Sequence, residues 1–171
     1  VFTDGGADAL AVADLSEGVR LRRHGFTLPI LVYPNALPDA ASEAIRHDLV
    51  PTLTNLDAAR AWSAAASGPC PIFVKVDVGL ERLGVPVEHA VKTIRAMLEL
   101  PHLRLAGVCT HAHAHAPLDA AYVEWQLARF TAVIDELTAQ GIDIPVRLAA
   151  SSPLVLHLPQ TYLNAVDPGR M

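Results

Sequence analysis

The chain has 171 residues, of which 51% are hydrophobic and 18% are charged, and its formal net charge is −5. A chain of this length and apolar content can bury one sizeable core, so disorder is excluded and residues 1–171 are treated as one domain. The negative charge excludes the basic surface that nucleic acid and anionic membranes require, so a small molecule is the expected ligand. No apolar run reaches the roughly 18 residues that a membrane span needs. Cys70 and Cys109 are too few and too far apart for a disulfide framework, which predicts a cytoplasmic protein.

Short apolar runs alternate with longer amphipathic stretches along the chain. The apolar runs predict β-strands at residues 9–15, 29–34, 49–54, 71–79, 103–111, 145–150 and 163–167. The stretches between them predict helices from Ser16 to Gly25, from Pro38, from Asn55 to about Ala66, from Pro86 to about Leu100, and from about Ala120 to Gln140. Most strands are continuously apolar, which is typical of a parallel sheet covered by helices.

Polar residues recur where a predicted strand ends. They are Asp14, Lys75, Asp77, Thr110, His111, Ser151, Ser152 and Asp167. Such residues at the ends of many strands are typical of the active site of a TIM-type (β/α)8 barrel, and no glycine-rich dinucleotide fingerprint follows the first strand. Seven strands do not close an eight-stranded barrel, and the chain begins with Val1 rather than Met. We therefore expect an α/β barrel that lacks its first βα unit and ends at its last strand.

The most informative segment is KVDVGLERLG, residues 75–84. Alternate residues of a strand face the same side, so Lys75 and Asp77 share one face, and Gly79 allows a tight turn that places Arg82 on the following loop. One interpretation is a Lys75–Asp77 ion pair with a surface arginine. The other is a functional site, because an unpartnered charge inside an apolar strand costs several kcal/mol.

This segment resembles the K-x-D-T-G-M-x-R-L-G signature of the alanine racemase family, whose members bind pyridoxal 5'-phosphate (PLP) on a TIM-type barrel followed by a β domain. The flanking segments GVCTHAHAHAP, SSPLVLHLP and NAVDPGRM are also similar to that family, and the resemblance covers essentially the whole chain. It implies a PLP-dependent amino acid racemase that interconverts L- and D-amino acids and is a homodimer when complete.

The resemblance implies a role for each matching residue. Arg82 matches the arginine that binds the phenolic oxygen of PLP and the substrate carboxylate, and Lys75 matches a lysine, carbamylated in some members, that orients it. His111 matches the histidine that packs on the pyridine ring. The cofactor-binding positions are Ser151, Ser152, Asp167, Gly169 and Arg170, of which Ser152 and the Gly169–Arg170 backbone match the phosphate-binding groups.

The departures from the family pattern also have implications. The lysine that forms the Schiff base in the family has no match in this chain, so the chain by itself is expected to be inactive. Asp167 stands where the family's alanine racemases carry an arginine against the pyridine nitrogen, and Leu148 replaces the histidine that supports that arginine. A carboxylate there favours a protonated pyridine, which predicts a different or broader substrate set.

Two alternatives remain open. The run His111, His113 and His115 places three imidazoles on one face of an extended segment, as in metal-dependent TIM-barrel hydrolases, and Asp77, Asp119 and His157 are the candidate further ligands. None of these residues matches a known metal motif, so we expect no metal. The other alternative is a non-catalytic PLP-binding barrel protein.

Overall fold

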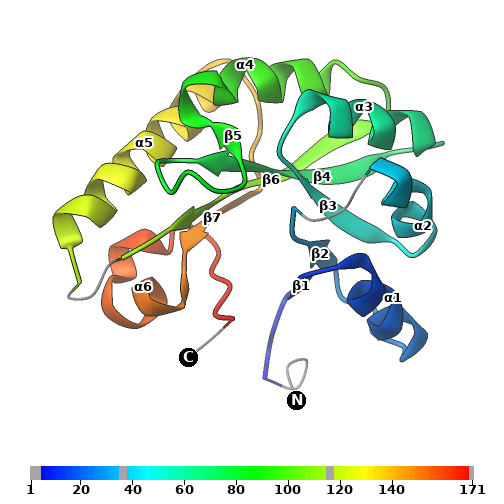
Figure 1. The fold of residues 1–171 in the computed structure, drawn as a ribbon, viewed down its shortest axis with the longest axis horizontal. Helices are drawn as coiled ribbons and strands as arrows, with labels where there is room; N and C mark the ends of the chain where they lie inside the picture. The colour runs from blue at the N-terminus through cyan, green and yellow to red at the C-terminus, as the bar shows by residue number, and fades with distance from the viewer. Residues whose placement is uncertain (1–4, 35–37, 115–117, 170–171) are drawn as a thin grey trace.

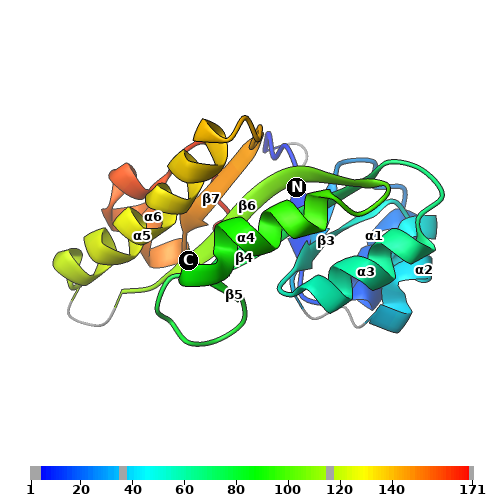
Figure 2. The ribbon, with the colours of Figure 1, turned by 90° about the horizontal axis from the view of Figure 1, so that it is seen from above.

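A computed structural model describes residues 5–34, 38–114 and 118–169. Parallel strands alternate with helices and form one curved sheet in the order β1-β2-β3-β4-β6-β7, with β5 paired to β4 (Figure 1). Helices α1 to α5 lie along the convex side of the sheet, and α6 lies at the end of β7, as the view from above also shows (Figure 2). The arrangement is half of a TIM-type barrel, which confirms the predicted fold class.

Six of the seven predicted strands form. The strands are β1 (Leu10–Val12), β2 (Ile30–Val32), β3 (Leu49–Leu53), β4 (Cys70–Asp77), β5 (Val85–Pro86), β6 (Leu103–Ala112) and β7 (Val146–Ala150). The strand predicted at 163–167 is wrong, because only Ala165 bridges to Leu148 of β7. The Asn164 side chain accepts a bond from the Arg147 N–H and donates one to the Pro145 carbonyl, so a side chain occupies the edge where a strand backbone would pair.

The helices agree with the sequence pattern to within a few residues. They are α1 (Leu15–Arg23), α2 (Ala41–Arg46), α3 (Leu56–Ala65), α4 (Val87–Leu98), α5 (Ala120–Ala139) and α6 (Ser152–His157), with short 3-10 turns η1 (Pro38–Ala40) and η2 (Pro159–Thr161). Asn55 caps α3 as predicted, but α1 is capped by Asp14, whose carboxylate accepts bonds from the Glu17 N–H and the Ser16 hydroxyl. Asp14 therefore serves a helix end rather than a functional site. No helix in the described residues is long and apolar enough to cross a membrane.

The core lies between the sheet and the helices, and it determines which strand residues face the concave side. Ile72, Val74 and Val76 of β4 are fully buried in the same cluster as Ile94 and Met97 of α4. Because side chains alternate along a strand, the residues between them on β4 face away from the helices. This places the Lys75 and Asp77 side chains on the concave side of the sheet.

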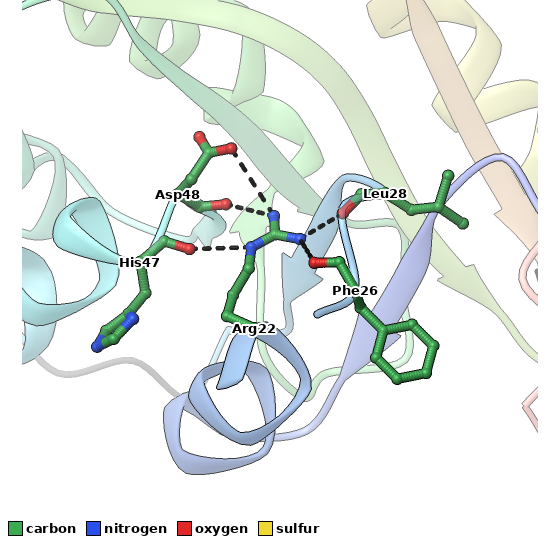
Figure 3. A network of polar contacts seen from close by, with 5 residues as sticks. All are labelled: Arg22, Phe26, Leu28, His47 and Asp48. Carbon is green, nitrogen blue, oxygen red and sulfur yellow. Dashed lines mark hydrogen bonds and ion pairs between the residues drawn. The ribbon is translucent and has the colours of Figure 1, made fainter. Parts of the chain in front are cut away.

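At the N-terminal ends of the strands, the Arg22 side chain joins α1 to the two segments that precede β2 and β3 (Figure 3). Its guanidinium donates hydrogen bonds to the carbonyls of Phe26, Leu28, His47 and Asp48 at 2.7–3.0 Å. These carbonyls immediately precede β2 and β3, so one side chain of α1 fixes where both strands begin. The ion pair with the Asp48 carboxylate adds little, because that carboxylate is 93% exposed and lies 3.8 Å away.

We expect Arg22→Met to lower the free energy of unfolding by about 2–4 kcal/mol, because the variant keeps the apolar stem but leaves four carbonyls without their charged donor. Denaturant unfolding of the purified chain measures the difference. Arg23→Met on the same helix, where the side chain is exposed, is the matched control and should change the value by less than about 0.5 kcal/mol. Equal loss in both variants would contradict a special role for Arg22.

Candidate functional site

The candidate site begins at the C-terminal end of β4, where the Asp77 carboxylate organises the loop that follows. Its Oδ1 accepts hydrogen bonds from the backbone N–H groups of Gly79, Leu80 and Glu81 at 2.9, 2.9 and 3.2 Å. Its Oδ2 accepts one from the Arg82 N–H at 2.8 Å. Burial by itself would raise the pKa of Asp77, but the four backbone donors outweigh it and hold the pKa below its usual value.

The Asp77 contacts decide between the two interpretations of the β4 charges. The carboxylate is committed to the loop backbone, and no Lys75–Asp77 ion pair forms among the described residues. Gly79 has a φ of +127°, a conformation that L side chains rarely adopt, so glycine is required where the chain turns away from β4. The sequence pattern predicted that Lys75 and Asp77 share a face. It did not predict that Asp77 acts as a clamp, that is, that its carboxylate accepts hydrogen bonds from four backbone N–H groups of residues 79–82.

Lys75 is almost fully buried on the concave side, with 8% of its surface exposed. Desolvation lowers the pKa of its ammonium group, and the nearby Arg82 guanidinium lowers it further, while the Asp77 carboxylate acts in the opposite direction. A small hollow is lined by side chains from Lys75, Asp77, Arg82, His111 and their neighbours Leu80 and Leu83. The structure therefore brings the three predicted catalytic residues, Lys75, Arg82 and His111, to one place.

His111 lies near the end of β6, beside the two cations. Desolvation lowers the pKa of His111 to about 4, and the positive charges of Arg82 and Lys75 contribute to the shift. The imidazole is therefore neutral at neutral pH. The end of β6 is fixed to β4 by the Thr110 hydroxyl, which donates a hydrogen bond to the Val76 carbonyl at 2.8 Å.

Cys109 belongs to this region, and the sequence analysis considered it only as a sign of the cellular compartment. The strand registers pair Lys75 with Cys109 and Cys109 with Leu148, so the three residues form a row across β4, β6 and β7. Complete burial raises the pKa of the Cys109 thiol to about 12. Such a thiol stays protonated, and it separates Lys75 from Leu148 as a small apolar spacer. The sequence feature that could have placed Cys109 in this region is its position two residues before His111.

A second group of predicted residues lies beyond the end of β7. Ser151 is the N-cap residue of α6, and its buried Oγ has no hydrogen-bond partner within the described residues. The Ser152 Oγ accepts a hydrogen bond from the Gly169 N–H at 3.1 Å, which joins the start of α6 to the last described residues. A Cβ at Gly169 would have no atom within 4 Å, so the space beside this glycine is open. Arg170 lies outside the described residues.

Asp167 is half-buried in the same segment, two residues after the Ala165 bridge to Leu148. Desolvation raises the pKa of Asp167 to about 6. Because β4, β6 and β7 are parallel neighbours, their C-terminal ends lie along one edge of the sheet. Both groups of predicted residues therefore belong to the same end of the half-barrel.

Within residues 5–34, 38–114 and 118–169, no group of three or more His, Cys, Asp or Glu side chains is placed to hold a metal ion. Two of the proposed further ligands have other partners. The Asp77 carboxylate holds the loop after β4, and the Asp119 carboxylate caps α5 by accepting a bond from the Tyr122 N–H. His115 lies outside the described residues.

The sequence of the chain is similar to those of known alanine racemases. A family model described as the N-terminal domain of alanine racemase matches residues 1–171. The alanine racemase of Desulforamulus reducens is 36% identical, with 99% of this chain and 47% of the relative covered. That of Methanococcus maripaludis is 34% identical, with 99% and 46% covered. The chain thus spans about half the length of the curated relatives it matches.

Solved structures give the same result. Alanine racemase of Clostridium difficile 630 in complex with cycloserine has a TM-score of 0.92 and 28% identity, with 98% of this chain and 47% of that chain covered. Alanine racemase of Bacillus anthracis with bound L-Ala-P has a TM-score of 0.87 and 27% identity, with 98% and 44% covered. The family model over residues 1–171 and these matches show that the chain belongs to the alanine racemase family.

Proposed function

We propose that this domain is the cofactor-binding half of a PLP-dependent amino acid racemase that acts on alanine and functions as a homodimer. The observation that carries the proposal is the hollow at the end of β4 and β6, where Asp77 holds the Arg82 loop beside a neutral His111 and a buried Lys75. The family membership of the chain supports the same activity. No observation favours a metal-dependent hydrolase or a non-catalytic barrel. The cytoplasmic location remains a prediction.

The residues present fit PLP. The buried Ser151 Oγ has no hydrogen-bond partner among the described side chains and backbone groups, and a phosphate oxygen would supply one. The Ser152–Gly169 hydrogen bond keeps the start of α6 next to an open glycine, where backbone can approach a phosphate closely. We assign the phosphate to this group, together with the backbone of Arg170.

The other residues would position the cofactor ring and the substrate. The neutral His111 imidazole can pack on a pyridine ring without placing a charge against it. Arg82 has a planar donor fork suited to an oxygen anion of PLP and to a substrate carboxylate. Lys75 would orient it in the carbamylated form that the family resemblance implies for some members, because a carbamate oxygen can accept a hydrogen bond from the guanidinium. When bound, PLP withdraws electrons from the α-carbon of the amino acid, which makes its proton acidic.

Asp167 is the candidate partner of the pyridine nitrogen. A carboxylate close to this atom favours its protonation, whereas the arginine implied at this position by the family resemblance disfavours it. The raised pKa of Asp167 means that its proton can be shared with a basic nitrogen near neutral pH. We therefore propose that Asp167 changes the range of amino acids accepted, compared with enzymes that carry arginine.

We expect the full-length protein that contains this domain to bind PLP and to interconvert L- and D-alanine. Arg82→Ala should lower kcat/KM by about 100-fold or more, because both the cofactor oxygen and the substrate carboxylate lose a charged donor. A coupled assay for D-alanine and the absorbance of bound PLP provide the measurements. Arg95→Ala, a change on the outer helix α4, is the control and should leave both unchanged. A full-length protein that binds PLP but racemises no amino acid would overturn the proposed activity.

We expect Asp167→Asn to stabilise the PLP-free 171-residue chain above pH 6. The pKa of Asp167 is about 6 in the folded chain and 3.8 when unfolded, so the folded state binds more protons between these values and stability falls as the pH rises through them. Asparagine removes this loss, which gives a gain of about 1–3 kcal/mol above pH 6 and none below pH 4. Denaturant unfolding from pH 3.5 to 8 measures it, with Asp135→Asn on the exposed face of α5 as the control. A gain that does not depend on pH would contradict the burial of a charged Asp167.

A further inference from the structure

The loop that carries Arg82 has a second support, which comes from the first turns of α5. The Tyr122 hydroxyl donates a hydrogen bond to the Gly79 carbonyl at 3.4 Å. A Cβ added at Gly79 would lie 2.7 Å from two ring atoms of Trp125, so the indole rests directly against the backbone of this glycine. The loop is therefore held by Asp77 from the β4 side and by Trp125 from the α5 side.

The Trp125 ring is itself fixed on two sides. Its centroid lies 5.8 Å from that of Tyr122, with 16° between the ring planes, and the Arg129 guanidinium carbon lies 4.6 Å from the indole centroid. Arg129 also forms an ion pair of 2.6 Å with Glu88, which is in the first turn of α4, just after β5. The stack therefore connects the beginning of the loop, at Gly79, to the element that follows its end.

Burial does not explain this tryptophan, because 46% of its surface is exposed. An aromatic ring that is half in solvent gains less from the hydrophobic effect than a core residue. The contacts of Trp125 with Gly79 and Arg129 therefore contribute more to fixing its position than burial does. The ring lies directly against Gly79, so it blocks any movement of this glycine toward α5. This glycine is also the position where backbone freedom is greatest.

We propose that Trp125 is a positioning residue for Arg82. It restrains Gly79 so that the four N–H groups of the loop stay on the Asp77 carboxylate and Arg82 stays beside His111. The consequence for catalysis rests on the proposed function. The restraint on the loop does not, because it follows from contacts within the described residues.

Gln126, the residue after Trp125, also connects α5 to the candidate site. Gln126 is fully buried, and its side chain accepts a hydrogen bond from the His113 N–H at 3.0 Å and donates one to the His113 carbonyl at 2.7 Å. Neighbouring residues of one helical turn therefore hold the segment that follows His111 and the loop that carries Arg82. Trp125 can be changed without removing the Gln126 contacts, so its effect should be specific to Arg82.

The test compares Trp125→Ala, Trp125→Phe and the control Glu124→Ala in the full-length protein. Glu124 is exposed on the same turn and makes none of these contacts. In the alanine variant, the amides of residues 79–82 should exchange hydrogen at least about 10-fold faster, while those of β4 residues 72–76 are unchanged. With PLP bound, KM for alanine should rise about 10-fold with kcat less affected, because a displaced Arg82 holds the carboxylate poorly. Phenylalanine, which keeps a flat ring at this position, should restore most of both properties.

Several results would overturn the proposal. Unchanged exchange at residues 79–82 in Trp125→Ala shows that Trp125 does not hold the loop, whatever the activity. Faster exchange with unchanged KM and kcat shows that the loop does not position Arg82 for the reaction. If Trp125→Ala does not fold, Trp125→Leu is measured in its place by the same criteria. A wild-type protein without racemase activity would overturn the proposed function, and the exchange measurement would still decide whether Trp125 restrains the loop.

Discussion

The site depends on one carboxylate that accepts four backbone hydrogen bonds. Asp77 ends β4, and without it the N–H groups of residues 79–82 would have no partner from the strand that the loop leaves. Hydrogen bonds to a charged acceptor are worth about 1.5–3 kcal/mol each, enough to hold a loop that contains a glycine at positive φ. Asp77 positions Arg82 directly, because the Arg82 N–H is one of the four donors. An exposed arginine on an unrestrained loop would spend little time in one position.

Around this clamp, desolvation sets the charge state of the concave face. It lowers the pKa values of Lys75 and His111 and raises those of Cys109 and Asp167, in each case against the charged form. Burial beside the cations Lys75 and Arg82 keeps His111 neutral. The Arg22 network lies at the other end of the strands, where it fixes the starts of β2 and β3. The Arg22 network and the candidate site thus lie at opposite ends of the strands, as is usual for structural and catalytic residues in barrels of this type.

The sequence was sufficient to predict the strand and helix rhythm, the fold class and the residues of the hollow, because these depend on apolar periodicity and on a ten-residue motif. It was insufficient where a side chain replaces backbone pairing. Asn164 hydrogen-bonds to the edge of β7, so a segment with strand-like composition makes one bridge only. Asp77 looked like the partner of Lys75, because spacing shows which residues share a face but not which hydrogen bonds they form. Trp125 lies on α5, and its contact with Gly79, which distinguishes it from the other residues of that helix, is visible only in the structure.

The two departures from the family pattern form one physical unit. Leu148 pairs with Ala165, and Asp167 follows Ala165 by two residues in the same segment. The resemblance implies a histidine at position 148 that supports an arginine at position 167. With leucine at 148, no described side chain donates a hydrogen bond to the Asp167 carboxylate, and desolvation is left to dominate its pKa. A carboxyl group that is costly to ionise without a partner gains most from a cationic ligand, and a protonated pyridine nitrogen is such a ligand. The apolar residue at 148 therefore suits Asp167 to the pyridine nitrogen that we propose as its partner.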